Sequence, residues 1–296
     1  MNASVAPRSD RTERSLGYRV RRTAGHVAFG LTVLVIISPA LLVFLWMLSL
    51  AFKNEVDNAA YPPVFIPNPP ILGNFTVAFE RNNFGQYTIN SLVVSGSTTL
   101  VSLLVGVPAA YGLAKAKAQG VALLVMISRM TPGLSYLIPL YMLFRFVGLG
   151  GQDWTMGISR QAITHLVIGL PIVVWVMIGF FEDLHPELEE AALTDGCDLW
   201  QAFYKVAMPL SLPGMVVSGI LAFIFSWNNF LFGVVLAGQN TRTLPVAVIN
   251  SLTFEQISWG PLAAAALIVT LPALILTILV QRHIVTGLTS GAVKGG

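Results

Sequence analysis

The sequence is poor in charge. Only 10% of its 296 residues are Asp, Glu, Lys or Arg, whereas 55% are hydrophobic. An ordinary soluble domain carries roughly 25% charged residues. Because a soluble fold of this size cannot bury so much apolar surface, part of that surface must face lipid. The composition therefore excludes an ordinary soluble enzyme or binding domain.

Cysteine and targeting signals are scarce as well. The single cysteine, Cys197, excludes an internal disulfide and a site built from several cysteines, and no metal ligands are expected. The first 26 residues are basic and polar, without the short apolar core and small cleavage residues of a secretory signal peptide. We therefore expect residues 1–26 to form a basic tail rather than a cleaved leader.

Long apolar runs are what the chain has in abundance. A helix crosses the hydrocarbon core with about 20 apolar residues, and six segments have that character: Val27–Phe52, Thr88–Ala114, Val121–Phe144, Ala162–Phe181, Gly214–Ala237 and Pro261–Val280. Prolines inside them are tolerated because neighbouring helices satisfy the freed backbone groups. The sequence thus predicts an all-α membrane protein whose residues 27–281 form a six-helix transmembrane domain.

The distribution of Lys and Arg predicts the orientation, since cytoplasmic loops carry the excess. With the first span starting inside, eleven basic residues are cytoplasmic: Arg8, Arg11, Arg14, Arg19, Arg21, Arg22, Lys115, Lys117, Lys205, Arg282 and Lys294. Five are outside: Lys53, Arg81, Arg145, Arg160 and Arg242. Both termini are therefore expected in the cytoplasm, with residues 282–296 as a C-terminal tail. The basic N-terminal tail either rests on anionic lipid or docks a partner.

The loop of residues 182–213, between the fourth and fifth spans, concentrates acidic residues. Seven of the chain's 14 lie between Glu182 and Asp198. Pro186 suits the first position of a helix, acidic residues suit its first turns, and Asp195-Gly196 suits its end, with Gly196 in a left-handed cap. A second short helix is expected from about Leu199 to Ala207, stopped by Pro209. The loop is thus predicted to be a helix–Gly–helix bracket at the membrane face.

The spacing within this bracket resembles the signature of the permease subunits of ABC importers. That signature is Glu-Ala-Ala, three residues, Gly, nine residues, Ile, one residue, Leu-Pro. The matching positions here are Glu190, Ala191, Ala192, Gly196, Val206, Met208 and Pro209, with Val206 and Met208 as conservative departures. The resemblance implies the type I importer permease fold. It also implies that the bracket, including Asp195, docks on a separate ATPase subunit. A capped amphipathic helix without partner is the plainer alternative.

Other stretches resemble the smaller permease of maltose- and trehalose-type sugar importers. They are Asn90-Ser91-Leu92, Ile138-Pro139-Leu140-Tyr141, Phe180-Phe181, Trp227-Asn228-Asn229-Phe230 and the end from Gly287 to Gly295. The family usually has Glu where Asn229 stands, which removes a buried carboxylate. By the same resemblance, Gly291, Ala292 and Lys294 in the C-terminal tail reach between the ATPases; a frayed terminus is the alternative.

The resemblance also implies the partners and the mechanism. Such a chain lies in the bacterial inner membrane, pairs with a second homologous permease and sits on two copies of an ATPase. A sugar-binding protein outside the cell delivers the substrate. ATP and Mg²⁺ belong to the ATPase, so this chain is expected to be non-catalytic and to hold no cofactor. It is expected to translocate a sugar, a di- or oligosaccharide, by alternating access, with lipid but no nucleic acid as further partner.

Polar residues inside the spans are candidates for the substrate path. Arg129 is the one formal charge within the six segments, and it is either a snorkelling anchor or an ion-pair or gate residue. At 100° per residue, Ser226, Asn229 and Gly233 share a face of the fifth span and Asn228 lies on another. With Trp227 they offer the amides and flat apolar faces that bind sugars. Hydrogen bonding between helices is the alternative.

Three other functions compete. A secondary transporter usually needs carboxylates within its spans, and the six segments contain no Asp or Glu. A membrane enzyme would need a metal cluster, a catalytic triad or a phosphate loop, and the sequence shows none of these motifs. An importer permease for another solute, such as glycerol phosphate, a polyol or phosphate, would carry the same bracket, and only the flanking sugar-type motifs argue against it.

Overall fold

All regular secondary structure is helical in the part that the computed structural model describes, residues 10–81, 83–151, 153–250 and 258–292. Its elements are α1 (Asp10–Ala51), α2 (Glu55–Asn58), α3 (Gly73–Arg81), α4 (Phe84–Lys115), α5 (Gln119–Met130), α6 (Gly133–Phe146), α7 (Trp154–Glu182), α8 (Pro186–Thr194), α9 (Leu199–Ala202), the π-helix η1 (Phe203–Ala207), α10 (Met208–Leu210), α11 (Leu212–Trp227), α12 (Leu231–Leu236), the 3₁₀-helix η2 (Gln239–Thr241), α13 (Leu244–Asn250) and α14 (Trp259–Ala292). The all-α class predicted from the sequence is confirmed.

Among the described residues, four helices are long and apolar enough to cross a bilayer: α1, α4, α7 and α14. Two bent pairs raise the number to six if each pair is one span, namely α5 with α6 and the α9–α10 segment with α11. The spans are longer than hydropathy suggested. α14 in particular continues through Gly291 to Ala292, so part of the expected C-terminal tail is helical.

The third predicted span, Val121–Phe144, was wrong as a single straight helix. α5 and α6 meet at an angle of 92°. The break lies at Thr131, whose φ of −67° and ψ of 129° are extended, directly before Pro132. The proline ring disfavours helical geometry in the preceding residue, so this proline redirects the chain.

The fifth predicted span, Gly214–Ala237, is also interrupted. α11 ends at Trp227, and α12 starts again at Leu231. Between them Asn229 uses its side-chain oxygen to accept a hydrogen bond from the Phe232 amide at 3.0 Å. Asparagine side chains compete with the helix ladder in this way, and the continuous 100° periodicity assumed for this span therefore does not apply.

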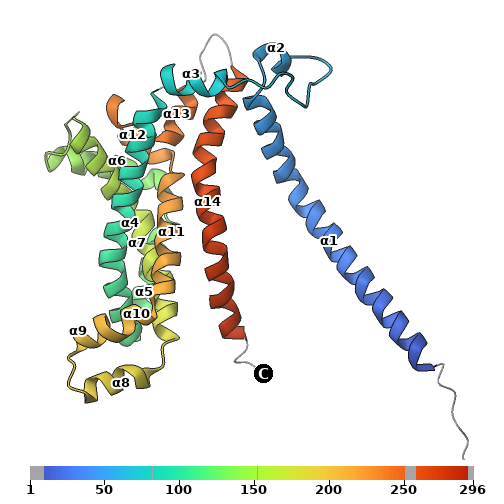
Figure 1. Cartoon of the computed structure of the whole chain (residues 1–296). Coiled ribbons are helices and arrows are strands. Elements are labelled where there is room, and N and C mark those ends of the chain that lie inside the picture. Colours follow the sequence, from blue (N-terminus) through green and yellow to red (C-terminus); the bar gives the residue numbers. More distant parts are fainter. Residues whose placement is uncertain (1–9, 82, 152, 251–257, 293–296) are drawn as a thin grey trace, which may run out of the picture.

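The core is a tight group formed by α4, α7 and α11 (Figure 1), with α8 and α9 packed at one end. Small residues allow α4 and α7 to approach closely, as is common between membrane helices. A Cβ atom built on Gly169 would lie 2.6 Å from the Ser102 hydroxyl, and one on Gly106 would lie 2.9 Å from Val173. The spacing of these two helices thus depends on glycine.

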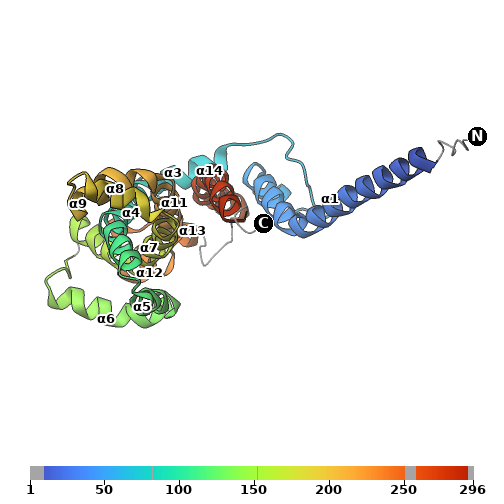
Figure 2. The ribbon, with the colours of Figure 1, turned by 90° about the horizontal axis from the view of Figure 1, so that it is seen from below.

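α1 stands apart from this group. It meets α14 near its C-terminal end, where Ala51 packs with Ala263 and Ala264, and then diverges from the bundle (Figure 2). Its apolar side chains remain exposed along most of its length; Phe29, for example, is 69% exposed. Such a helix needs lipid or another membrane chain around it.

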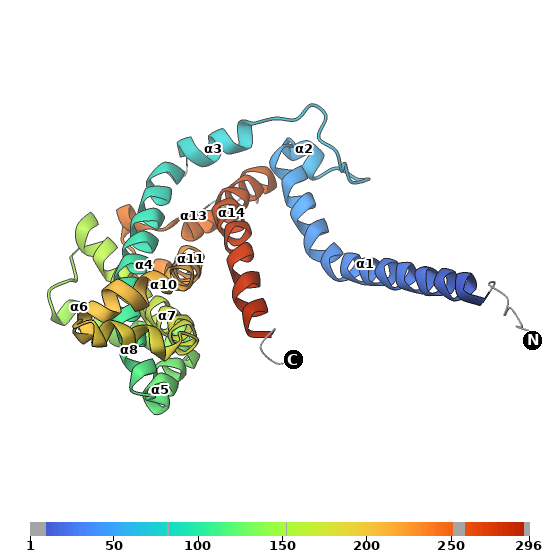
Figure 3. The ribbon, with the colours of Figure 1, turned by 60° about the horizontal axis from the view of Figure 1, so that its bottom comes forward.

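α2 and α3 lie at the same end of the molecule (Figure 3), and polar side chains hold this end together. Lys53 is 1% exposed; its ammonium donates to the Val64 carbonyl at 2.6 Å and lies 4.6 Å from the Trp46 ring centre. Burial lowers the pKa of Lys53, partly opposed by the negative charge of Asp57. Glu55 accepts hydrogen bonds from the first amides of α14. These contacts give the loop after α1 a defined structure.

The prediction that Arg160 lies in an exterior loop is wrong. It lies inside α7, is 7% exposed, and donates to the carbonyls of Leu149 and Gly151 at 2.7 and 2.9 Å. A third contact reaches the Leu236 carbonyl at 3.4 Å. Arg129 is therefore not the one charge within the helical spans. Carbonyl groups at the ends of neighbouring helices supply the partners that a buried guanidinium requires.

The packing of α4 on α7 predicts that Gly169→Val destabilises the protein. The added side chain would overlap Ser102 and Thr98, at a cost of about 1–3 kcal/mol. Gly179→Val is the matched control, since nothing lies within 4 Å of a Cβ atom at that position of the same helix. Thermal unfolding of both variants in detergent measures the difference. Equal melting temperatures for the two variants would contradict this packing.

Candidate coupling site and substrate path

The first half of the bracket, α8, begins and ends as its sequence predicted. Pro186 occupies the first turn. At the other end Gly196 has a φ of +89°, its amide donates to the Leu193 carbonyl, and the Cys197 amide donates to the Ala192 carbonyl. These two bonds form a Schellman cap, which requires a left-handed residue and favours glycine. The predicted cap at Gly196 is confirmed.

The second half of the bracket runs from α9 through η1 to α10. The Asp198 side chain caps it by accepting a hydrogen bond from the Gln201 backbone amide at 2.7 Å. The Gln201 side-chain oxygen in turn accepts one from the Asp198 backbone amide, which completes a capping box. The helical segment extends to Leu210, one residue beyond Pro209, before it bends by 74° into α11. The predicted second helix is therefore present, with a π-helical turn at residues 203–207.

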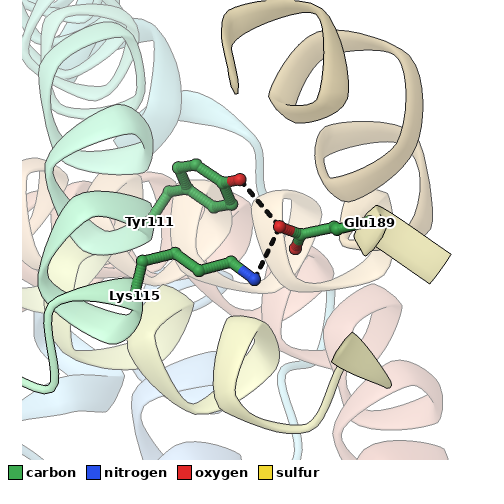
Figure 4. A network of polar contacts seen from close by, with 3 residues as sticks. All are labelled: Tyr111, Lys115 and Glu189. Atoms are coloured by element: carbon green, nitrogen blue, oxygen red, sulfur yellow. Dashed lines mark hydrogen bonds and ion pairs between the residues drawn. The ribbon is translucent and has the colours of Figure 1, made fainter. Parts of the chain in front are cut away.

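A buried carboxylate ties the bracket to the bundle (Figure 4). Glu189 on α8 is 5% exposed. It pairs with the Lys115 ammonium at 2.6 Å and accepts a hydrogen bond from the Tyr111 hydroxyl at 2.8 Å. Both partners belong to the last turns of α4. A buried carboxylate is stable only when it is paired in this way, so α8 is held at the C-terminal end of α4.

An aromatic anchor holds the other half of the bracket. Phe203 is 1% exposed and belongs to the same hydrophobic cluster as Val107 of α4 and Met177 of α7. Its ring centre lies 4.8 Å from that of Tyr111, within the range of favourable aromatic pairs. The bracket therefore shares its core with the spanning helices, and a displacement of the bracket would strain their packing.

The bracket still presents an outward surface at the end of the molecule where α4 ends and α1 begins (Figure 1). Among the residues singled out from the sequence, Ala192 is buried, Val206 and Met208 are half-buried, and five are exposed: Glu190, Ala191, Asp195, Gly196 and Pro209. The signature thus divides into an inner part that packs on the bundle and an outer part free to meet another protein.

The polar residues predicted for the substrate path do not converge. Ser226 is buried and its hydroxyl lies 2.7 Å from the His165 ring. Trp227 is 2% exposed and donates to the Val269 carbonyl of α14 at 2.9 Å. Both residues therefore join helices, which is the alternative that the sequence left open. Asn228 is exposed beside them, at the C-terminus of α11.

The remaining residues predicted for the substrate path each contact a different part of the structure. Asn229 caps α12. A Cβ atom on Gly233 would lie 2.5 Å from the Thr243 hydroxyl, so that glycine permits close packing. Arg129 lies 4.9 Å from the ring centre of Phe225 on α11, a cation–π contact. Gly291 and Ala292 belong to α14, with side chains outside the described set, and Lys294 lies outside the described residues.

A comparison with known protein families matches the sequence to one of them. Residues 102–289, which include the bracket, fit the model of the binding-protein-dependent transport system inner membrane component. The chain belongs to this family. It is an inner-membrane permease of the ABC importer type, and the family expected from the bracket signature is confirmed.

Named relatives agree with this assignment. The permease is 36% identical over 253 residues to the probable ABC transporter permease protein y4oR of Sinorhizobium fredii, covering 85% of this chain and 89% of the relative. It is 35% identical over 268 residues to the trehalose transport system permease protein SugB of Mycobacterium tuberculosis, covering 88% and 95%. A crystal structure of a bacterial ABC transporter involved in alginate import contains a chain with the same fold, with a TM-score of 0.67, 20% identity and 95% and 99% coverage.

Sequence reasoning missed how the permease fastens its bracket. In the sequence Glu189 is one of several acidic residues of the loop. Lys115 contributes only to the charge balance, and no pattern singles out Tyr111. Their spacing along α4, four residues apart, does place them on one helix face. Nothing in the sequence marked Glu189, rather than Glu187 or Glu190, as their partner, because the choice depends on the direction in which α8 packs.

The buried pairing predicts that Glu189→Gln lowers the free energy of unfolding of the permease. The variant removes the charge that Lys115 faces, and because Lys115 is itself 45% exposed, the loss should be about 1–2 kcal/mol. Glu187→Gln, on the exposed side of the same helix, should change stability by less than about 0.5 kcal/mol. Chemical denaturation of the purified chain in detergent measures both. An equal effect of the two substitutions would show that the Glu189 pairing is not stabilising.

Proposed function

We propose that this chain is the membrane-spanning subunit of an ATP-driven importer that moves a saccharide into the cell by alternating access. The observation that carries the proposal is the bracket of α8–α10. It combines the spacing of the permease signature with a rigid cap at Gly196 and an exposed outer surface. In this proposal that surface, centred on Glu190, Ala191 and Gly196, seats against an ATPase subunit.

The anchoring of the bracket supports a mechanical role. Glu189 holds it to the end of α4, and Phe203 packs it against α4 and α7. A push on α8 is therefore delivered to the two helices that form the centre of the bundle. α4 spans 32 residues, or about 48 Å at 1.5 Å per residue, so a small rotation at the bracket end becomes a larger displacement at the other end. We propose that closure of the ATPases rocks the spans in this way.

The proposed partners follow from what the chain lacks and from its family. The sequence has no phosphate-binding loop, so ATP and Mg²⁺ are assigned to a separate ATPase present in two copies, and this subunit is proposed to be non-catalytic. The family is defined by dependence on a binding protein, which supports delivery of the substrate by an extracytoplasmic partner. The exposed apolar length of α1 leaves room for a second permease.

The saccharide class is supported by the relatives rather than by a site in the centre of this chain. One of them is named as a trehalose permease. Uptake of labelled mono-, di- and trisaccharides by cells with and without this gene tests the class. Loss and rescue of uptake of one saccharide is the expected result. Loss of uptake of a polyol or a phosphate ester, with every saccharide unaffected, would contradict the sugar assignment while leaving the importer proposal in place.

Substitutions at Gly196 separate docking from local folding. Gly196→Arg should abolish transport, because the side chain would project from the exposed cap into the ATPase. Gly196→Asn should retain transport, since asparagine tolerates the left-handed conformation at a cost of about 1 kcal/mol or less and adds little bulk. Uptake and membrane insertion are measured for both, and Glu190→Arg should behave as Gly196→Arg does.

Gly120→Arg provides the matched control. Gly120 follows α4 at the same end of the molecule, and nothing lies within 4 Å of a Cβ atom there. This variant should transport normally. Normal uptake by Gly196→Arg and Glu190→Arg, each inserted at normal levels, would contradict the proposal that this surface docks on the ATPase.

A further inference from the structure

A polar cavity lies at the opposite end of the bundle from the bracket. Its volume is about 490 Å³, within the range of small-molecule sites. Three segments far apart in the sequence form it: the start of α4, the start of α7 and the 3₁₀-helix η2. Its lining residues are Asn83, Gln86, Tyr87, Trp154, Gln239 and Asn240.

Asn90 holds the three segments of the cavity together. Its side-chain oxygen accepts from the Gln86 amide at 3.0 Å and from the Trp154 indole at 2.8 Å. Its amide group donates to the carbonyls of Asn240 and Arg242, at 3.0 and 2.9 Å. Asn90 is completely buried and makes as many hydrogen bonds as an asparagine side chain can. The three segments that form the cavity are therefore joined to one another through a single side chain.

Several polar groups on this wall are left without a protein partner. Within the described residues, the side chains of Asn83, Gln239 and Asn240 and the hydroxyl of Tyr87 make no hydrogen bond. Each of the three amide side chains has donors and an acceptor. Trp154 is 39% exposed, and its indole N–H is already satisfied by Asn90, so its ring is held in one orientation.

The chemistry of this wall suits a neutral carbohydrate. Sugar hydroxyls both donate and accept hydrogen bonds, as amide side chains do, and the apolar face of a sugar ring packs on a flat aromatic ring. None of the six lining residues is charged, so nothing here offsets the desolvation of a carboxylate or sulfonate. A phosphate or an acidic sugar would require basic residues, and the described part of the lining has none.

We propose that this cavity is a saccharide-binding subsite of the permease, used before the substrate enters the membrane. The inference rests on the proposed function and gives this chain its own contact with the sugar. Tyr87 lies about 36 Å from Tyr111 along α4, at 1.5 Å per residue. The subsite is therefore at the far end from the ATPase bracket, on the side where substrate enters in an importer. A neutral disaccharide is favoured over an acidic one.

Photoaffinity labelling of the complete transporter in nanodiscs tests this directly, with a diazirine derivative of trehalose as the probe. The label is mapped by mass spectrometry, with and without excess unlabelled trehalose. Gln239→Leu combined with Asn240→Leu removes two unpaired amides and leaves the backbone bonds of η2 in place. Loss of two hydrogen bonds to the sugar should reduce labelling by about tenfold or more.

Two controls match these substitutions. Gln119→Leu removes an exposed amide at the bracket end, and Trp175→Ala, on the same helix as Trp154, controls for Trp154→Ala. Labelling at residues 83–87, 154 or 239–240 that trehalose competes away, and that only the cavity variants reduce, is the expected result. Uptake of trehalose at saturating binding protein should fall in the same variants.

The two proposals fail in different ways. A transporter that imports trehalose but is labelled elsewhere, or equally in the cavity and control variants, would overturn the subsite and leave the importer function intact. A transporter that neither imports nor is labelled by trehalose or by any saccharide of the uptake panel would contradict both. Labelling by a probe that excess trehalose does not displace would also count against the subsite.

Discussion

The carboxylate of Glu189 is buried at the point where the bracket meets the bundle, and the arrangement of this whole end depends on its being paired. Lys115 and Tyr111 are its partners, both from α4. Because a buried carboxylate without partners is costly, α8 is held in one position. Phe203 in turn packs against residues of both α4 and α7. The bracket is thus part of the core on its inner side and solvent-exposed on its outer side.

The opposite end of the bundle is also held by buried polar side chains. Asn90 joins α4, α7 and the segment around η2 by four hydrogen bonds, and Arg160 and Gln161 add contacts from α7 to the same region. α4 therefore carries a polar junction at each end, and α7, which approaches it through Gly106 and Gly169, takes part in the second one. In the proposed mechanism one junction receives force from the ATPases and the other meets the sugar.

Local signals in the sequence predicted the elements, and long-range packing decided the rest. Pro186 and Gly196 fix the ends of α8 through the backbone preferences of proline and glycine, which can be recognised in the sequence alone. Hydropathy located the apolar segments but carries no direction, so it missed the 92° turn at Thr131–Pro132 and the break at Asn228–Asn229. The burial of Arg160, the choice of Glu189 as the paired acid and the gathering of six neutral residues around one cavity depend on contacts between distant segments.

The reactivity of Cys197 tests the central claim most directly. It is the one cysteine of the chain and lies half-buried in the cap of α8, beside Gly196. Alkylation by a maleimide is measured in the transporter with and without its ATPase subunits, with a cysteine placed at Tyr61, at the far end, as the reference. If the bracket is the docking surface, bound ATPase slows alkylation of Cys197 by an order of magnitude and leaves the reference unchanged. Equal rates at Cys197 in the two preparations would contradict the account.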